Sequence, residues 1–144
     1  YDHGRGRPRP YGPPQDIPMF RTFLTALVTF FALDMVWLGV VAKGFYRDKM
    51  GHLLRPDVQW APAIVFYLIF VAALVVFVVQ PAQEKQSLRH AILYGAFFGL
   101  ATYAAYDLTN LALAKDFPTI VAVVDLAWGA TLSAAVAAVA YKLG

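Results

Sequence analysis

The sequence predicts an all-α integral membrane protein, a bundle of four membrane-spanning helices, on three observations. Of the 144 residues, 60% are hydrophobic and 15% are charged, whereas soluble domains are about half apolar and about a quarter charged. Four apolar segments each reach the roughly 20 residues that a helix needs to cross a hydrocarbon core of about 30 Å. Short polar stretches separate these segments, so consecutive helices are expected to be antiparallel neighbours.

Residues 1–18 are expected to form an extended or disordered N-terminal tail. They contain three glycines, five prolines and three arginines, and such a segment buries too little apolar surface to offset its ordering entropy. The chain starts at Tyr1, whereas Met19 would be a natural start for a compact membrane protein. The tail is therefore interpreted either as the remainder of a processed precursor, for example of an organelle protein, or as an added segment.

The four-helix membrane domain is predicted at 19–144, with its helices at about 20–42, 59–80, 87–114 and 119–142. A glycine C-cap is expected at Gly44, where the first helix ends. Pro81 is expected to stop the second helix, and Ser87 to cap the start of the third. The fourth helix follows Pro118, and residues 43–57 are expected to form a polar, basic loop.

The basic residues favour an orientation with both termini on the cytoplasmic or matrix side. Seven lysines and arginines fall on the side of the termini and five on the opposite side, and the positive-inside rule places the larger number in the cytoplasm. Without the tail the count becomes four against five. The opposite orientation therefore stays open.

Three aspartates lie inside the apolar segments, where a lone carboxylate costs roughly 2.5–3.5 kcal/mol to insert. Asp34 lies eight residues before the end of its helix, Asp107 lies seven before the end of the third helix, and Asp125 lies six after the start of the fourth. At about 1.5 Å per residue, all three are about 9–12 Å from the same membrane surface. Tyr67 on the second helix lies at a similar depth. The aspartates are therefore expected to share one layer.

Stripes at a four-residue spacing put two of these aspartates on helix-packing faces. The stripes consist of Gly95, Gly99, Tyr103 and Asp107 on the third helix and Asp125, Gly129, Ser133 and Ala137 on the fourth. Small residues at this spacing let membrane helices approach closely, and intramembrane carboxylates normally face the bundle interior. The placement of Asp34 is predicted from its depth alone.

We expect the aspartates to form one intramembrane pocket that binds or moves a small polar or cationic solute, or protons. Three close carboxylates cannot all ionise cheaply, so at least one is expected to carry a proton near neutrality. The predicted ligand-binding residues are Asp34, Asp107, Asp125, Asn110, Tyr106, Tyr103, Tyr67, Trp37 and Trp128. Alternatively, the aspartates only cross-link helices through neutral hydrogen bonds, and the two tryptophans, each three residues after an aspartate, are interfacial anchors.

Other kinds of chemistry have less support. The chain has no cysteine, which excludes disulfides and thiolate metal sites, and its histidines lack ligand spacing, so no metal, cofactor or catalytic residue is assigned. The basic residues flank helices or lie in the tail, so no nucleic-acid partner is expected. An aspartic-protease pair lacks a Gly-x-Gly-Asp context. A lipid-modifying enzyme that uses His52 as a base stays open as a third alternative, although a role without catalysis is favoured.

Four sequence blocks resemble a family of small bacterial membrane proteins known as domain of unknown function 2177, over about residues 19–144. These blocks are 34–39 (DMVWLG), 51–54 (GHLL), 106–112 (YDLTNLA) and 124–129 (VDLAWG). The resemblance implies a four-helix membrane protein and no established activity. A bacterial inner membrane or an organelle inner membrane is the expected location. The expected partners are the lipid bilayer and either a second copy or a larger membrane complex, in which the chain would alternatively serve as an accessory subunit.

Overall fold

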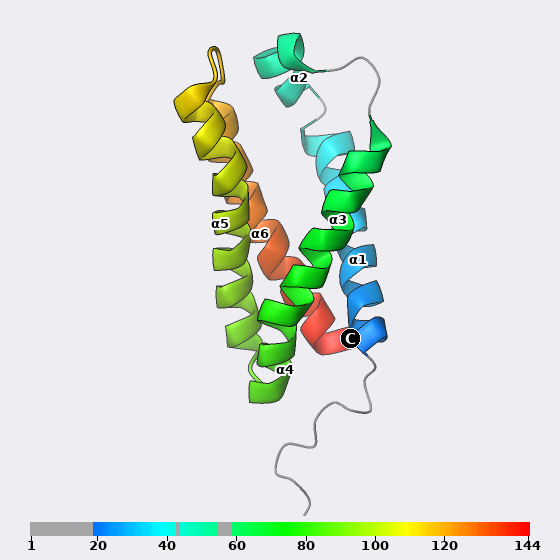
Figure 1. Cartoon of the computed structure of the whole chain (residues 1–144). Coiled ribbons are helices and arrows are strands. Elements are labelled where there is room, and N and C mark those ends of the chain that lie inside the picture. The colour runs from blue at the N-terminus through cyan, green and yellow to red at the C-terminus, as the bar shows by residue number, and fades with distance from the viewer. Residues whose placement is uncertain (1–18, 43, 55–58) are drawn as a thin grey trace, which may run out of the picture.

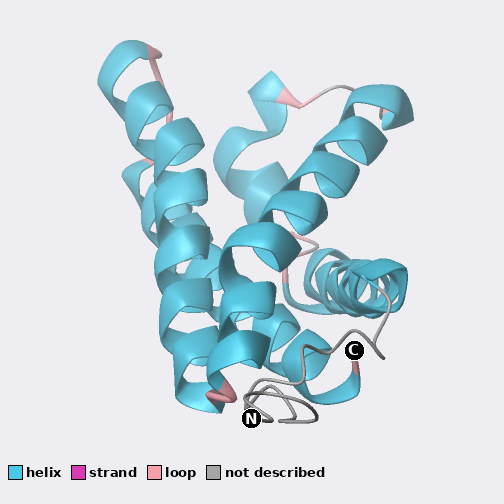
Figure 2. Ribbon diagram, turned by 60° about the horizontal axis from the view of Figure 1, so that its bottom comes forward, coloured by secondary structure: helices cyan, strands magenta, loops and turns pink. Residues whose placement is uncertain are grey.

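The computed structural model describes residues 19–42, 44–54 and 59–144, so the predicted tail at 1–18 lies outside the described residues. These residues form helices and short loops and contain no strand (Figure 2). Four helices are long and apolar enough to cross a membrane: Met19–Val40, Trp60–Lys85, Leu88–Leu113 and Thr119–Leu143. The predicted all-α bundle with four candidate spans is confirmed.

The first span ends differently from the prediction. Helix α1 (Met19–Val36) continues as a π-helical segment, η2 (Trp37–Val41), which closes with a 2.7 Å hydrogen bond from the Ala42 N–H to the Trp37 carbonyl. Gly44 has a φ of −94° and a right-handed conformation, so the expectation of a left-handed glycine C-cap was wrong. Instead, Gly44 is the N-cap of the next helix.

Within the predicted polar loop lies a short helix, α2 (Phe45–Met50), followed by a single 3₁₀ turn, η3 (Gly51–Leu53). The two basic side chains of α2, Arg47 and Lys49, are exposed, whereas Met50 is buried. Because this apolar side chain packs towards the bundle, the segment folds back over one end of the spanning helices (Figure 1).

The second span runs past Pro81, against the prediction that this proline stops it. Helix α3 (Trp60–Leu74) continues through a π-helical segment, η4 (Val75–Val79), into α4 (Gln80–Lys85). Pro81 lies in the first turn of α4, where a missing N–H is tolerated. The N–H of the preceding residue, Gln80, bonds to the carbonyl of Val75 five residues back, so the π-helical register extends up to the proline. The helix ends at Gln86, which is left-handed with φ 51°.

The third and fourth spans pack side by side over most of their length (Figure 1). Helix α5 (Leu88–Leu113) begins where the Ser87 hydroxyl accepts a 3.0 Å hydrogen bond from the His90 N–H, as predicted, and α6 is Thr119–Leu143. A Cβ placed on Gly95 would lie 2.9 Å from the Ser133 carbonyl oxygen and 3.0 Å from the Ala137 Cβ. The backbones therefore meet through the small-residue stripes.

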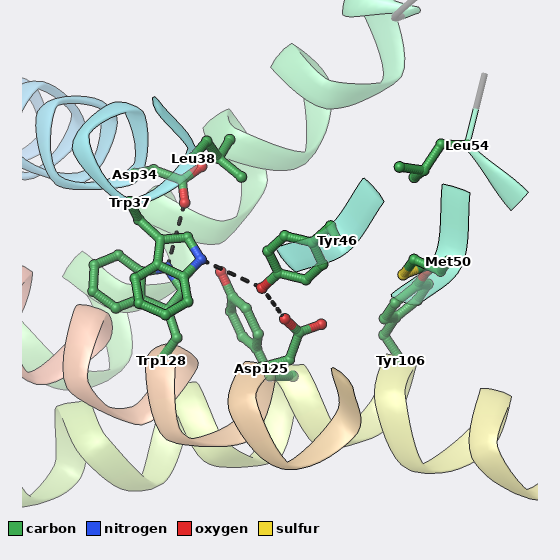
Figure 3. Close-up of a pocket in the computed structure, with 10 residues that line it drawn as sticks. Asp34, Trp37, Leu38, Tyr46, Met50, Leu54, Tyr106, Asp125 and Trp128 are labelled. Atoms are coloured by element: carbon green, nitrogen blue, oxygen red, sulfur yellow. Dashed lines mark hydrogen bonds between the residues drawn. The ribbon is translucent and has the colours of Figure 1, made fainter. Parts of the chain in front are cut away.

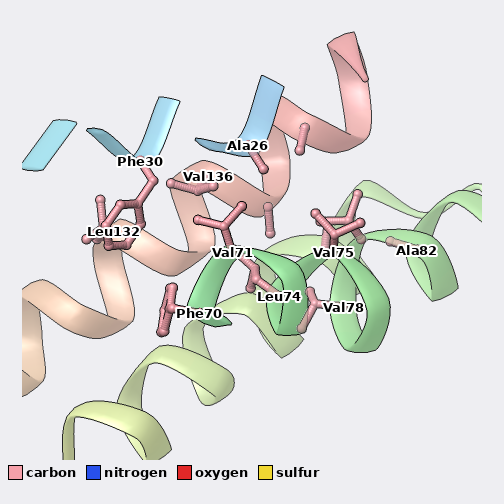
Figure 4. Close-up of a cluster of buried hydrophobic side chains, with 14 residues drawn as sticks. Ala26, Phe30, Phe70, Val71, Leu74, Val75, Val78, Ala82, Leu132 and Val136 are labelled. Carbon is pink, nitrogen blue, oxygen red and sulfur yellow. The ribbon is translucent and has the colours of Figure 1, made fainter. Parts of the chain in front are cut away.

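The main hydrophobic core lies towards the end of the bundle that holds the C-terminus (Figure 4). Phe30, Val71, Leu74, Leu132 and Val136 are almost completely buried there. At the opposite end, α3 and α5 diverge in both views of the chain (Figures 1 and 2). The helices are thus tightly packed in one half of the bundle and splayed in the half that carries the aspartates.

Candidate functional site

Asp34 is held by donors from two other helices. Its Oδ2 accepts a 2.9 Å hydrogen bond from the Tyr67 hydroxyl of α3, and its Oδ1 accepts a 3.4 Å bond from the Trp128 indole N–H of α6. The side chain is 8% exposed. Because both carboxylate oxygens have protein donors, Asp34 joins α1, α3 and α6 at this depth.

Asp125 is held from the loop side of the bundle. The Tyr46 hydroxyl of α2 donates a hydrogen bond to Asp125 Oδ1, and the same hydroxyl accepts a 3.3 Å bond from the Trp37 indole N–H. The second carboxylate oxygen points away from Tyr46, on the side of Tyr106 and Met50 (Figure 3). Asp125 is only partly buried, and its carboxyl group also lies within hydrogen-bonding reach of Asp107.

The two tryptophans connect these two carboxylates. The indole rings of Trp37 and Trp128 are stacked, with centroids 4.4 Å apart and an interplanar angle of 8°. Each indole donates towards the aspartate of the other helix: Trp128 donates to Asp34 directly, and Trp37 reaches Asp125 through the hydroxyl of Tyr46. The stack therefore ties α6 to the segment where α1 becomes π-helical, a type of irregularity that is frequent at functional sites.

A cavity of about 400 Å³ lies beside this network (Figure 3). Aromatic rings form much of its wall, and Asp34 and Asp125 supply its carboxylates. Among the described residues its lining consists of Asp34, Trp37, Leu38, Tyr46, Met50, Leu54, Tyr103, Tyr106, Asp125 and Trp128. The cavity is thus acidic and aromatic, and α2 closes its loop side.

Asp107 lies behind this wall and does not line the cavity. Its side chain is fully buried, and neither of its oxygens has a hydrogen-bond partner among the described residues. Its nearest acidic neighbour is Asp125, whose carboxyl group lies within hydrogen-bonding reach of it. A buried carboxylate without donors is very costly, and a proton shared between the adjacent carboxyl groups of Asp107 and Asp125 removes that cost.

The predicted site residues fall into two groups in the structure. Those that line the cavity are Asp34, Trp37, Tyr103, Tyr106, Asp125 and Trp128. The other three do not line it. Tyr67 donates a hydrogen bond to Asp34, and Asp107 is fully buried. The Asn110 amide donates a 2.8 Å bond to the Tyr106 carbonyl of its own helix. Nothing in the described structure therefore supports a direct role of Asn110 in ligand binding.

Four lining residues were missed by the sequence interpretation: Leu38, Tyr46, Met50 and Leu54. The last three belong to the segment that was expected to be a solvated loop, where no helical periodicity could place them. The signal that could have found this segment is the apolar pattern of Phe45, Tyr46 and Met50 around the charges of 47–49, which is typical of a short amphipathic helix.

Tyr46 lies outside the spanning helices and its ionisation is suppressed. Burial of the ring, and then the hydrogen bond to Asp125, raise the pKa of the Tyr46 hydroxyl above its ordinary value. The hydroxyl is therefore a donor at all physiological pH values. Among the described residues, no group of three histidine, aspartate or glutamate side chains could hold a metal ion.

The fold and this cluster define a helical membrane protein with four candidate spans and an acidic, aromatic cavity among them. The chain belongs to the family described as Predicted membrane protein (DUF2177), whose model matches residues 19–142. The resemblance seen in the four sequence blocks is thereby confirmed. No curated protein and no solved structure matches the chain. The family description assigns a membrane location and no activity.

Proposed function

We propose that the cavity binds a small organic cation, an ammonium ion, at Asp125. The observation that carries this proposal is a partly exposed carboxylate, with one oxygen directed away from the Tyr46 hydroxyl, in the wall of an aromatic cavity. An opposite charge is the strongest complement for such a carboxylate in a setting of low dielectric constant.

The three aspartates differ in whether their oxygens are available to a ligand. The oxygens of Asp34 are both occupied by Tyr67 and Trp128, and Asp107 is enclosed without access to the cavity. Asp125 is left as the carboxylate that can meet a ligand. The other two then have supporting roles, Asp34 as a cross-link between helices and Asp107 as an enclosed neighbour of Asp125.

The aromatic walls favour an organic cation over a metal ion. Organic ammonium groups are attracted to the faces of tryptophan and tyrosine rings, by about 2 kcal/mol or more where water is excluded. Trp37, Trp128, Tyr46, Tyr103 and Tyr106 supply such rings here. Metal ions prefer several oxygen or nitrogen ligands, whereas this cavity offers few. Its volume of about 400 Å³ also falls within the range of small-molecule sites.

The test uses the full chain purified in uncharged maltoside micelles, titrated with tetramethylammonium chloride at constant ionic strength against sodium chloride. The readout is tryptophan emission in a Trp60→Phe background, because Trp60 is exposed at the start of α3 and would dilute the signal of the stacked pair. We expect a saturable change that Asp125→Asn weakens by at least about tenfold, the equivalent of roughly 1.4 kcal/mol.

Asp116→Asn is the matched control. Asp116 is an exposed carboxylate between α5 and α6 with φ 63°, and asparagine tolerates this left-handed conformation well. The control variant is expected to bind as the parent protein does. A saturable signal that survives Asp125→Asn would contradict the proposal, and so would the absence of any saturable signal in the folded protein; the latter would favour the accessory-subunit interpretation.

A further inference from the structure

Asp125 also lines a second cavity. It has a volume of about 430 Å³ and is lined by Phe66, Thr102, Tyr103, Tyr106 and Asp125. The last three of these residues also line the first cavity. The two cavities therefore meet at Asp125, Tyr103 and Tyr106, one extending under α2 and the other between α3 and α5.

The second cavity lies at the depth of the hydrocarbon core. Phe66 is six residues beyond the start of α3 at Trp60, and Thr102 is eleven residues before the end of α5 at Leu113. These separations correspond to depths of about 9 Å and about 16 Å along the helices. Of the residues that line this cavity, Phe66 is 45% exposed and Thr102 is partly exposed. The mouth of this cavity therefore faces lipid tails.

The divergence of α3 and α5 explains why there is space at this level (Figure 1). Nearer the core, Phe70 of α3 closes the gap by packing on Phe98, with ring centroids 5.3 Å apart, and on Tyr103 at 6.4 Å. Beyond this aromatic contact the helices separate. Thr102 is too small to fill the gap, and its hydroxyl donates to the carbonyls of Phe98 and Gly99 on its own helix.

We infer that the ligand of this site is a cationic amphiphile: an ammonium head group bound at Asp125, with a single alkyl chain that leaves between Phe66 and Thr102 into the lipid. This inference rests on the proposed function and specifies its ligand. The head group would meet the carboxylate and the faces of Tyr103 and Tyr106, which both cavities share. The chain would stay in an apolar environment along its whole length, so it would not have to be exposed to water during entry.

The experiment compares dodecyltrimethylammonium with tetramethylammonium, two probes with the same head group, on the full chain in maltoside micelles with the Trp60→Phe background. Affinities are referred to the concentration of free probe in water, where two or three buried methylene groups contribute a factor of ten or more. On this scale the parent protein is expected to bind the long-chain probe at least about tenfold more tightly. Asp125→Asn is expected to weaken both probes.

Thr102→Phe separates the two cavities. The added ring is expected to fill the lateral cavity and to remove most of the advantage of the long-chain probe, while the affinity for tetramethylammonium stays within about twofold. Leu100→Phe is the matched control, because Leu100 is 41% exposed on the same helix and does not line this cavity. Both probes are expected to bind this control as they bind the parent. If Thr102→Phe does not fold, Thr102→Leu provides a smaller obstruction with the same expected direction.

The outcomes distinguish the two proposals. Equal affinity for the two probes in the parent protein, or a long-chain advantage that both Thr102 variants leave intact, would overturn the lateral inference and leave the small-cation proposal standing. If neither probe binds, both proposals fail. Binding of the long-chain probe alone, lost in Asp125→Asn and in Thr102→Phe, would support the amphiphile and remove the free small cation as a ligand.

Discussion

The indole rings of Trp37 and Trp128 stack face to face, 4.4 Å apart, across two antiparallel helices. Each ring follows an aspartate of its own helix by three residues and donates towards the aspartate of the other helix, in one case through Tyr46. The same Asp-x-x-Trp spacing on two antiparallel neighbours thus produces a reciprocal arrangement. Removing either ring is therefore expected to affect both carboxylates.

The first prediction concerns this stack. Trp128→Phe removes the donor to Asp34 Oδ1 and part of the ring contact, so the free energy of unfolding is expected to fall by about 1–2 kcal/mol. Thermal or denaturant unfolding in micelles provides the measurement. In a double-mutant cycle with Trp37→Phe, the coupling energy is expected to be about 0.5–1.5 kcal/mol.

Trp60→Phe is the control for this cycle, because Trp60 is 55% exposed at the start of α3 and is expected to change the stability by no more than about 0.5 kcal/mol. Additive effects of Trp37→Phe and Trp128→Phe would show that the stack contributes nothing beyond two separate side chains.

Helix rise and residue spacing predicted the fold and a large part of the cavity lining. The aspartate-bearing segments could be aligned because apolar spans must cross the same thickness of hydrocarbon, which puts Asp34 and Asp125 at one level before any contact is known. The sequence could not reveal that Asp107 lies behind the wall. Rotation about a helix axis depends on packing, and the stripe that contains Asp107 indicated only that it faces a neighbouring helix.

The wrong or missing predictions share a physical cause: the local preferences of single residues are overridden by the structure around them. Pro81 would stop an isolated α-helix, but the π-helical turns before it remove the demand for its N–H. Gly44 would suit a left-handed cap, but it begins α2 instead. Tyr46 was missed because the amphipathic pattern of its segment is only six residues long, and because its contact with Asp125 spans 79 positions of the chain.

A second prediction compares the two most buried aspartates. Apart from the neighbouring carboxyl group of Asp125, neither oxygen of Asp107 has a hydrogen-bond partner among the described residues. Asp107→Leu is therefore expected to leave the free energy of unfolding unchanged or to raise it. Asp34→Leu leaves the Tyr67 hydroxyl and the Trp128 N–H without their acceptor and is expected to cost about 1–3 kcal/mol. Unfolding of both variants in the same micelles tests this difference. Equal losses would mean that Asp107 makes a stabilising bond.

A third prediction addresses the contact between α5 and α6. A Cβ on Gly99 would overlap the Gly129 carbonyl, and one on Gly129 would overlap the ring of Tyr103. Each Gly→Ala substitution is expected to force the helices or the ring apart and to cost about 1–3 kcal/mol. Gly129→Ala should also weaken ligand binding, because Tyr103 lines both cavities.

Gly39→Ala is the control for these glycines, since a Cβ there meets nothing within 4 Å. It is expected to be neutral or slightly stabilising, by up to about 1 kcal/mol, because alanine is the better helix former. A loss at Gly39 equal to those at Gly99 and Gly129 would attribute the effect to the backbone rather than to helix packing.

The last prediction is a pH dependence that originates outside the membrane-spanning helices. Burial and the bond to Asp125 raise the pKa of Tyr46 above its ordinary value of about 10. The folded state therefore holds the phenolic proton more tightly than the unfolded state. The contribution of the Tyr46 proton to the free energy of unfolding is fully present below about pH 10. It decreases at higher pH, where the unfolded chain loses this proton first.

Thermal unfolding of the parent and of Tyr46→Phe from pH 7 to pH 11 isolates this contribution from lysine titration, because both proteins contain the same lysines. Their stability difference is expected to stay constant up to about pH 10 and to shrink above it, whereas a difference that already shrinks between pH 7 and pH 9 would assign the change to a group other than the Tyr46 hydroxyl.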